Sequence, residues 1–582
     1  MNPTIRRALW PAVTMLTGAW AGDIVCAHVR ARLAAGDDAN RIINTWTAAF
    51  RNPTPSPDQA DLACGLIIAA MIGLAWLYHW ARKGNYRTGE EYGSARWATP
   101  RDMAPYTSPD PARNLQMTAT EGISIDTHAT GRNTNVTAIG SSGSGKSHYY
   151  VLPNLLANHD LNWAVTDPKG ELYDQTREQL EHHGYQVKLL DLANLTDVTH
   201  FNPLAYIDPD QPDTAIMRLV TNIMDNTDSP DTRARQSGND GFWAKAERSL
   251  LTALTALVYH TDDEPNLNKV ADLALKMEAS EEDETMRFDV DILMECAEQL
   301  AEQVHAHPQE WDEEARATAE GLRFAVSQYR PFTQGAGETK KSVIISLGVR
   351  LAPMQVGAVR RILESDDIGI DRYAQGGRLA IFLALPDEDP TFNFIASVFY
   401  QCLFDRLMRA TRILPGQRLP RPLHCMLDEF ANIGRIPNFE RLIATIRSRG
   451  ISASIIIQNL AQLKTMYKDG WETIIGNCDN ILFLGGNEQT TTEWISKRLG
   501  KATIDTKDHS ESKGRSGSTT TNYRRLGREL MTPDELGHLD NRECIYMLRG
   551  LNPFKSRKNT PDKPVRRPHS TLRRTIANQT RK

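Results

Sequence analysis

Eight consecutive residues carry the clearest chemistry in this chain, with the sequence GSSGSGKS. They fit the phosphate-binding pattern G-x-x-x-x-G-K-[ST] at every fixed position. Its glycines let the backbone curl so that successive N–H groups point at one anion. The lysine can reach the β- and γ-phosphates of a nucleotide, and the last serine can ligate Mg²⁺. The pattern predicts that ATP and Mg²⁺ bind through Gly140, Ser141, Ser142, Gly143, Ser144, Gly145, Lys146 and Ser147.

The neighbours of this octet decide between a nucleotide site and a glycine- and serine-rich linker. Val136–Ile139 precedes it as an apolar run, which predicts a buried strand. Residues 149–157 follow with a helical pattern, in which Pro153 must lie near the first turn. Strand, loop and helix in this order are what the motif requires, so the sequence favours the nucleotide site.

A second candidate group follows the apolar run Leu423–Leu427. Asp428 is suited to hold Mg²⁺ together with Ser147, directly or through water. Glu429 is suited to polarise an attacking water. Alone, an Asp-Glu pair also fits an ordinary polar turn at the end of a strand. In one sheet with the octet, the pair predicts a site for ATP hydrolysis.

Two more side chains flank the run Ile451–Ile457, which also has the pattern of a strand. Gln458 follows it, and a neutral amide there can contact the γ-phosphate and report its loss. Arg447 and Arg449 precede it, and either can reach a neighbouring subunit's nucleotide as an arginine finger. A surface glutamine and a solvated arginine are the simpler alternatives.

The elements that must position these residues are short apolar runs alternating with helical stretches. The runs are almost continuously hydrophobic, which is typical of parallel strands buried on both faces. Their alternation with helices predicts an α/β, doubly wound sheet, whose ligand groups gather at the carboxyl ends of the strands. The predicted strands after the octet are 163–166, 186–190, 378–385, 423–427, 451–457, 480–484 and 544–548.

The sequence between about 203 and 332 shows no strand pattern and several helical ones. It predicts an all-α insertion at 205–334, which divides the α/β domain into 88–204 and 335–550. Acidic stretches within the insertion fit a solvated surface better than a binding site.

Residues 62–80 contain no charged side chain. As a helix they would span roughly 28 Å, about the thickness of the hydrocarbon core of a bilayer. Aromatic residues near the end, and Arg82 and Arg87 beyond it, fit a membrane boundary. A buried core helix is the alternative, but few soluble helices are apolar on every face for this length. The segment therefore predicts a transmembrane helix.

Residues 8–25 form a weaker apolar segment because they include Pro11 and Asp23. They are either a first, uncleaved transmembrane helix, which we favour, or a secretory signal. Both interpretations place residues 27–60 outside and the chain after Arg82 in the cytoplasm, where ATP is. Residues 1–87 would then anchor a multi-pass membrane protein whose bulk is cytoplasmic.

The remaining composition is ordinary. A net charge of −5 restricts any nucleic-acid surface to local patches. Seven cysteines without a C-x-x-C pair indicate reduced thiols in a cytosolic protein, not a metal site. Residues 507–522, rich in Ser, Thr and Gly, predict a long flexible loop. The basic tail, 551–582, is predicted to be disordered. It can contact nucleic acid or anionic lipid, or it can simply aid solubility.

Several further segments give the chain a resemblance to type IV coupling proteins, the TraG/TraD-like ATPases of conjugation and type IV secretion. The combination of D-P-K-G-E with the octet and the two apolar front segments is specific, whereas each motif alone is weak. The matches extend over about residues 90–550. They are YGSARW at 92–97, TDPKGEL at 166–172, FNPL at 201–204, GETKKS at 337–342, DEF at 428–430 with Gly434, Gln458 with Gln462 and Leu463 behind it, and LMTPDEL at 530–536.

The resemblance implies a RecA-like P-loop nucleotide-binding domain with an all-α inserted domain and a two-helix transmembrane anchor in the bacterial cytoplasmic membrane. It implies a homo-hexameric ring that passes single-stranded DNA, with its attached relaxase, to a type IV secretion channel. Gln458 then matches the family's third nucleotide motif. Arg447, eleven residues before Gln458, falls where the family carries its arginine finger, so we prefer it to Arg449.

Two other functions remain as alternatives. The first is an ATP-binding receptor that captures protein cargo without powering transport. The second is a duplex DNA pump of the cell-division type, which ranks lower because that class has more membrane spans and a winged-helix tail. The acidic insertion and the segment 507–522 leave cargo recognition open.

Overall fold

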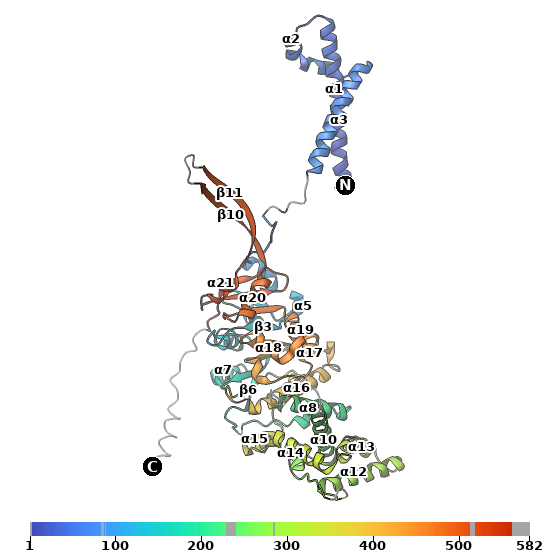
Figure 1. Cartoon of the computed structure of the whole chain (residues 1–582), viewed down its shortest axis with the longest axis vertical. Coiled ribbons are helices and arrows are strands. Elements are labelled where there is room, and N and C mark those ends of the chain that lie inside the picture. The colour runs from blue at the N-terminus through green and yellow to red at the C-terminus, as the bar shows by residue number, and fades with distance from the viewer. Residues whose placement is uncertain are drawn as a thin grey trace, which may run out of the picture. The chain divides into compact units, whose positions relative to one another are not determined.

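The computed structural model describes residues 3–82, 87, 89–196, 198–227, 240–282, 286–512 and 518–561 (Figure 1). The chain divides into two compact units. The first comprises Met1–Ser94 with Thr503–Gly527, and the second comprises Ala95–Ala502 with Arg528–Lys582.

A nine-stranded sheet forms the centre of the second unit, with the strand order β13-β12-β9-β3-β8-β7-β4-β6-β5. The seven strands from β9 to β5 are parallel, and β12 and β13 are antiparallel at one edge. Every strand predicted from the sequence lies in this sheet. The nine strands of the sheet are β3 (Val136–Ile139), β4 (Asn162–Pro168), β5 (Gln186–Asp191), β6 (Leu379–Leu385), β7 (Leu423–Leu427), β8 (Ile451–Ile457), β9 (Asn480–Phe483), β12 (Glu543–Leu548) and β13 (Phe554–Arg557), of which β13 was not predicted.

Helices cover both faces of this sheet, which explains why its strands are so uniformly apolar. Successive residues of β4 point into two different cores: Trp163 and Val165 into one, Ala164 into the other. All residues of β6, β7 and β8 are buried. The helices of this domain are α6 (Leu152–Ala157), α7 (Glu171–His182), α16 (Asn393–Ala410), α17 (Phe439–Thr445), α18 (Leu460–Tyr467), α19 (Trp471–Gly476), α20 (Gln489–Leu499) and α21 (Pro533–Gly537).

The strand order decides which loops meet. β8 lies between β3 and β7, with Ile139 paired to Ile457 and Leu427 paired to Ile455. The residues that follow these three strands therefore emerge side by side at the carboxyl edge of the sheet. They are the octet, Gln458 and Asp428.

A helical region lies between β5 and β6, as the green to yellow ribbon of Figure 1 shows. The predicted boundary at residue 334 is too early: the helices continue to Glu364, and α14 packs against α10 and α11. The segment GETKKS at 337–342 opens α14. The helices are α8 (Pro212–Thr227), α10 (Asp240–Thr261), α11 (Leu267–Leu275), α12 (Asp289–Ala306), α13 (Glu313–Thr333), α14 (Gly337–Leu351) and α15 (Gly357–Glu364).

Two long helices, α1 (Pro3–Ala34) and α3 (Gln59–Ala81), pack against each other in the first unit. Both contain a stretch long and apolar enough to cross a bilayer, Leu9–Ala34 and Gln59–Ala81. Gly65 lies so close to α1 that an added Cβ would collide with the carbonyl oxygen of Ala19. Small residues at such crossings allow apolar helices to pack by close backbone contact.

These helices are longer than predicted. The segment 8–25 is part of a helix that continues to Ala34, and Pro11 lies inside it. At the far end of α1, Arg30 pairs with Asp61, which is fully buried at the start of α3. This ion pair compensates the charges of Arg30 and Asp61 where the two apolar helices meet, so α1 can continue past its apolar part to Ala34.

The segment 507–522 is not simply the flexible loop that its composition suggests. Residues 507–512 belong to β10 (Lys501–Ser512) and 518–522 to β11 (Ser518–Glu529), which pair as a two-stranded sheet. Residues 513–517 lie outside the described residues. None of residues 501–509 is buried, so this pair of strands has no core face to require an apolar alternation. The two strands are held by main-chain pairing, so their sequence lacks the hydrophobic pattern from which a strand could be predicted.

The predicted disorder of the tail 551–582 is also wrong for its first part. Phe554–Arg557 is strand β13, and Lys558 after it is buried. Residues 562–582 lie outside the described residues.

Candidate nucleotide site

The octet forms a curled loop between β3 and the following helical turn. Gly143 and Gly145 have φ values of 77° and 81°, the left-handed region that glycine adopts without strain. An added Cβ on Gly145 would also collide with the ring of Tyr149. The chain continues as one turn of π-helix, Ser147–Val151, and then as α6, where Pro153 lies in the first turn as expected. The local sequence therefore fits the loop closely.

Lys146 holds its ammonium inside this loop. The side chain is largely buried, and Nζ donates a hydrogen bond to the carbonyl oxygen of Gly140 at 3.0 Å. Nζ also lies 3.7 Å from Oε2 of Glu429. The ammonium thus faces both the loop and a carboxylate of the neighbouring strand end, where a phosphate oxygen can replace the carbonyl as its acceptor.

Ser147 and Asp428 are brought together, as predicted for a shared metal ion. The Ser147 hydroxyl donates to the Asp428 carboxylate. Asp428 is only 2% exposed, and burial raises the pKa of its carboxyl to about 6. A hydroxyl and a carboxylate are oxygen ligands of the kind that Mg²⁺ prefers, and a bound cation would restore the ionised form of the acid. The residues present fit Mg²⁺.

Glu429 takes an unusual backbone conformation at the same place. Its φ is 53°, which is uncommon for a residue with a Cβ. Oε1 accepts a hydrogen bond from Nε2 of Gln458, the residue after β8. The main-chain N–H of Gln458 donates to the side-chain amide of Gln462 at 2.9 Å. The glutamine that follows the intervening strand β8 therefore orients the candidate catalytic carboxylate.

The D-P-K-G-E segment closes β4 and starts α7. The Asp167 carboxylate accepts hydrogen bonds from the N–H groups of Leu172 and Tyr173, at 3.1 and 2.8 Å. Burial raises the pKa of Asp167 to about 7, and the negative charge of Asp428 adds to the effect. Lys169, with φ at 77°, points outward and pairs with Asp387 at 3.1 Å. Asp167 therefore provides acceptors for two N–H groups in the first turn of α7, a helix whose N-cap residue is Gly170.

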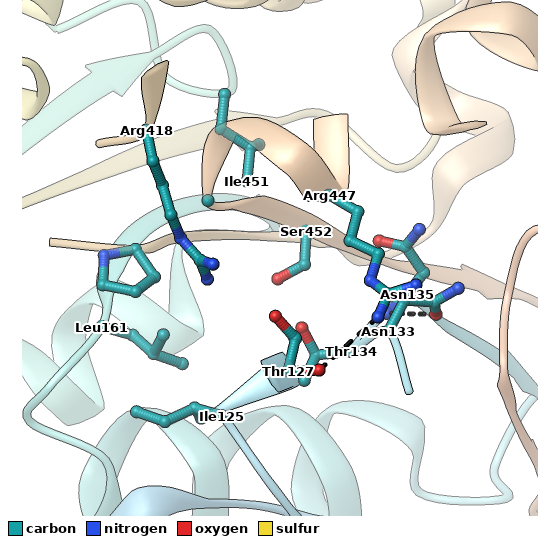
Figure 2. A pocket seen from close by; sticks show the side chains of 12 residues that line it. Ile125, Thr127, Asn133, Thr134, Asn135, Leu161, Arg418, Arg447, Ile451 and Ser452 are labelled. Carbon is teal, nitrogen blue, oxygen red and sulfur yellow. Dashed lines mark hydrogen bonds between the residues drawn. The ribbon is translucent and has the colours of Figure 1, made fainter. Parts of the chain in front are cut away.

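Arg447 does not lie at this site. It belongs to a 3₁₀ turn, Ile446–Arg449, that precedes β8, whereas Gln458 follows β8. Seven residues of strand separate the two by roughly 20 Å. Arg447 lines a small pocket with Asn133, Asn135 and Ser452 (Figure 2). Its Nη2 donates a long hydrogen bond, 3.5 Å, to the carbonyl oxygen of Thr127.

A buried chain of hydrogen bonds links the elements under the site, and sequence reasoning missed it. The Tyr150 hydroxyl contacts Oγ of Ser454 at 2.6 Å, and this Oγ contacts Nε2 of His424 at 2.8 Å. Nδ1 of His424 contacts Oγ of Ser452 at 2.7 Å. Burial lowers the pKa of His424 to about 3, so the ring is neutral. The histidine inside an otherwise apolar strand was the available signal.

Lys558 is the second residue that the sequence did not reveal. Its ammonium donates to the carbonyl oxygen of Ser144, inside the octet, at 2.8 Å. It lies in the basic segment that composition alone assigns to a disordered tail, and no local motif marks it.

The family model described as type IV secretory system conjugative DNA transfer matches residues 110–560. The chain belongs to this family. The expected resemblance is thereby confirmed, and the matched range includes the octet.

Individual relatives agree with this assignment at modest identity. Conjugal transfer protein TraG of Agrobacterium fabrum is 25% identical over 432 residues, 71% of this chain and 58% of that protein. Protein VirD4 of Rhizobium rhizogenes is 25% identical over 431 residues, 71% of this chain and 56% of the relative. These alignments span less than two thirds of either relative. TraG of Escherichia coli is 24% identical over 531 residues, with 84% and 78% coverage.

Solved structures share the fold. The bacterial conjugative coupling protein TrwBdeltaN70, in an unbound form, has a TM-score of 0.57 at 15% identity, covering 81% of this chain and 95% of that one. TrwB in complex with ADP and Mg²⁺ has a TM-score of 0.55 at 14% identity, with the same coverage. The predicted fold class is confirmed: a RecA-like α/β domain with an all-α insertion and two N-terminal apolar helices.

Proposed function

We propose that this chain is a membrane-anchored ATPase that couples ATP hydrolysis to the delivery of relaxase-linked single-stranded DNA into a type IV secretion channel. The observation that carries the proposal is the convergence of five side chains at one edge of the sheet: Lys146, Ser147, Asp428, Glu429 and Gln458. Family membership supplies the biological setting.

Nucleotide binding requires few changes in the site. Lys146 exchanges the carbonyl oxygen of Gly140 for phosphate oxygens, and the loop's N–H groups supply further donors. Ser147 and Asp428 would hold Mg²⁺, which neutralises charge on the phosphates during transfer. That TrwB has been observed with ADP and Mg²⁺, and with a non-hydrolysable ATP analogue, supports this assignment.

We assign catalysis of hydrolysis to Glu429, the carboxylate that follows the proposed Mg²⁺ ligand Asp428. Glu429 accepts a proton from the attacking water as general base. The amide of Gln458 fixes the orientation of that carboxylate, and Gln462 in turn fixes the main chain at Gln458. Because Gln458 ends the strand between the octet and Asp428, loss of the γ-phosphate is sensed at a point shared by β3, β8 and β7.

The position of Arg447 supports a ring of identical subunits. In its own chain Arg447 lies before the amino end of β8, whereas the phosphate loop lies at the carboxyl end of the neighbouring strand β3. An arginine finger here must therefore act on the nucleotide of a neighbouring subunit, which fits a homo-hexamer.

The front helices supply the membrane anchor of the proposal. With α1 and α3 both spanning, residues between them lie outside and the nucleotide-binding unit lies in the cytoplasm. Reporter fusions that are active only on one side of the membrane, placed near residue 50 and after residue 561, should report opposite sides. The same side for both would contradict this topology.

ATP turnover by the purified full chain in detergent tests the enzymatic part, with and without Mg²⁺ and single-stranded DNA. Glu429→Gln should lower turnover by roughly 10²–10³ while nucleotide binding persists, and Lys146→Ala should weaken binding itself. Glu472→Gln, an exposed glutamate of α19, removes the same charge elsewhere and should leave turnover unchanged. DNA is expected to stimulate turnover less as salt rises, because phosphate contacts are screened.

Transfer in donor cells separates this proposal from the receptor alternative. A motor loses transfer with either Glu429→Gln or Lys146→Ala. A receptor that only binds ATP keeps transfer with Glu429→Gln and loses it with Lys146→Ala. Expression and membrane location of both variants are checked in the same cells.

A further inference from the structure

The last strand of the sheet ends beside the phosphate loop. β13 is antiparallel to β12, and β12 is antiparallel to β9, so β13 runs in the direction of β3. The residue after β13 therefore emerges at the same edge of the sheet as the octet. That residue is Lys558, whose main-chain N–H donates to the carbonyl oxygen of Arg542 at 2.9 Å.

The ammonium of Lys558 makes two hydrogen bonds to neutral oxygens. Nζ donates to the carbonyl oxygen of Ser144 at 2.8 Å and to Oδ1 of Asn541 at 3.2 Å. It also lies 5.4 Å from the ring centroid of Tyr149, the residue whose ring packs against Gly145. Lys558 is 5% exposed. Holding a cation in this environment is costly unless its hydrogen bonds are well made, so its place here is specific.

The bond to Ser144 constrains the peptide that joins Ser144 to Gly145. In a trans peptide the C=O and the N–H point in opposite directions. Holding the carbonyl of Ser144 toward Lys558 therefore fixes the N–H of Gly145 on the other side of that peptide. Gly145, with a φ of 81°, has no side chain to restrict rotation of this unit by itself. An outside restraint is therefore useful to a loop that binds phosphate through oriented N–H groups.

We propose that Lys558 is a positioning residue for the nucleotide: it orients the Ser144–Gly145 peptide so that the phosphate loop is preformed for its anion. The inference rests on the proposed nucleotide binding and adds a residue 414 positions from its contact in the octet. Lys558 does not touch the nucleotide in this scheme, because its acceptors are protein oxygens.

The test measures affinity of the full chain in detergent for a non-hydrolysable ATP analogue with Mg²⁺, together with KM and kcat for ATP. Lys558→Met keeps the length of the side chain and removes its charge and donors, so we expect affinity to fall about tenfold or more. KM should rise more than kcat falls. Lys558→Arg should restore most of the affinity because it can donate to the same carbonyl.

Lys555→Met is the matched control. It removes a lysine from the same strand, but Lys555 is exposed and pairs with Glu543 at 2.8 Å. Its affinity should equal that of the unmodified chain. Affinity of Lys558→Met within twofold of this control would overturn the inference. If the unmodified chain and Lys555→Met both fail to bind, it is the proposed function that fails.

A second substitution and a melting curve separate positioning from folding. Asn541 is exposed, and Asn541→Ala removes one of the two acceptors that hold the ammonium. It should weaken binding about threefold, with an unchanged melting temperature of the nucleotide-free chain. No loss of affinity in Asn541→Ala would count against the restraint. A loss in Lys558→Met that only follows a lower melting temperature would assign it to folding.

Discussion

The two ends of the strands in the central sheet differ in how many of their polar side chains contact one another within one chain. At the carboxyl edge, Ser147 contacts Asp428, Gln458 contacts Glu429, and Lys146 faces the same carboxylate. At the amino edge, Arg447 makes no ion pair among the described residues and one long hydrogen bond to a carbonyl. A phosphate site assembles inside one chain because its groups follow adjacent strands. Arg447, at the other end of β8, lies roughly 20 Å from that site.

The sharpest way to break this comparison is to mix two inactive variants. Arg447→Ala should lower ATP turnover by roughly 10³, as loss of an arginine finger does, while nucleotide affinity changes little. Lys146→Ala should be inactive because its own loop cannot hold phosphate. Mixed together, the two should regain measurable turnover, since an intact loop from one subunit meets an intact arginine from the other.

Arg449→Ala provides the matched control for that experiment. Arg449 is two residues away and donates to the side chain of Gln417 at 2.9 Å. It should keep nearly full turnover alone. If Arg447→Ala keeps full turnover and Arg449→Ala does not, the assignment of the finger is wrong. If the mixture stays inactive although both variants assemble, action between subunits is contradicted.

A smaller effect is expected where Gln458 supports Glu429. Gln458→Leu removes the donor to Oε1 while keeping similar bulk, so the carboxylate loses its orientation. Turnover should fall about tenfold, and affinity for ATP should change less. Gln489→Leu, an exposed glutamine of α20 that bonds Glu493, is the control. An unchanged kcat in Gln458→Leu would remove Gln458 from the mechanism.

The smallest effect concerns pH, because Asp428 changes its charge in the accessible pH range whereas Arg447 does not. Burial raises the pKa of Asp428 to about 6, and this carboxylate must be ionised to hold Mg²⁺. Affinity for the nucleotide with Mg²⁺ should therefore weaken severalfold as the pH falls from about 7.5 to about 5.5. The measurement is a binding titration at each pH.

Binding in the presence of EDTA is the control for that titration, because it retains the nucleotide's own ionisation and removes the metal. It should show a weaker dependence on pH. The restoration of turnover by mixing Arg447→Ala and Lys146→Ala should keep its proportion to the unmodified chain across this range, since an arginine stays charged. Equal pH dependence with and without Mg²⁺ would contradict the role given to Asp428.

The parts of the fold that sequence patterns predicted correctly are those with a strong local signal. Buried parallel strands need apolar residues on both faces, so runs such as 451–457 could be identified directly. A two-stranded pair such as β10 and β11 has no such face, and its polar sequence resembles that of a loop. The helical region extends beyond the predicted boundary at 334, because α14 packs against the helices α10 and α11 that precede it in the chain.

The candidate site divides in the same way. The octet and the pair Asp428–Glu429 each sit next to one strand, so type and spacing revealed them. Their mutual contacts depend on β8 lying between β3 and β7, which no single segment encodes. Figure 2 shows the corresponding result for Arg447: its neighbours Asn133 and Asn135 come from a part of the chain some 300 residues earlier.

By itself, the sequence predicted a phosphate loop and a metal-binding carboxylate, and it determined two apolar segments of membrane-spanning length, because each depends on residues close together in the chain. Only the tertiary structure decided that Gln458 supports Glu429, that Arg447 faces away from its own nucleotide site, and that Lys558 holds the carbonyl of Ser144. Those relations come from the order and direction of strands in the sheet. Hydrogen bonds form between whatever residues the finished fold places within about 3 Å of one another, however far apart they are in sequence.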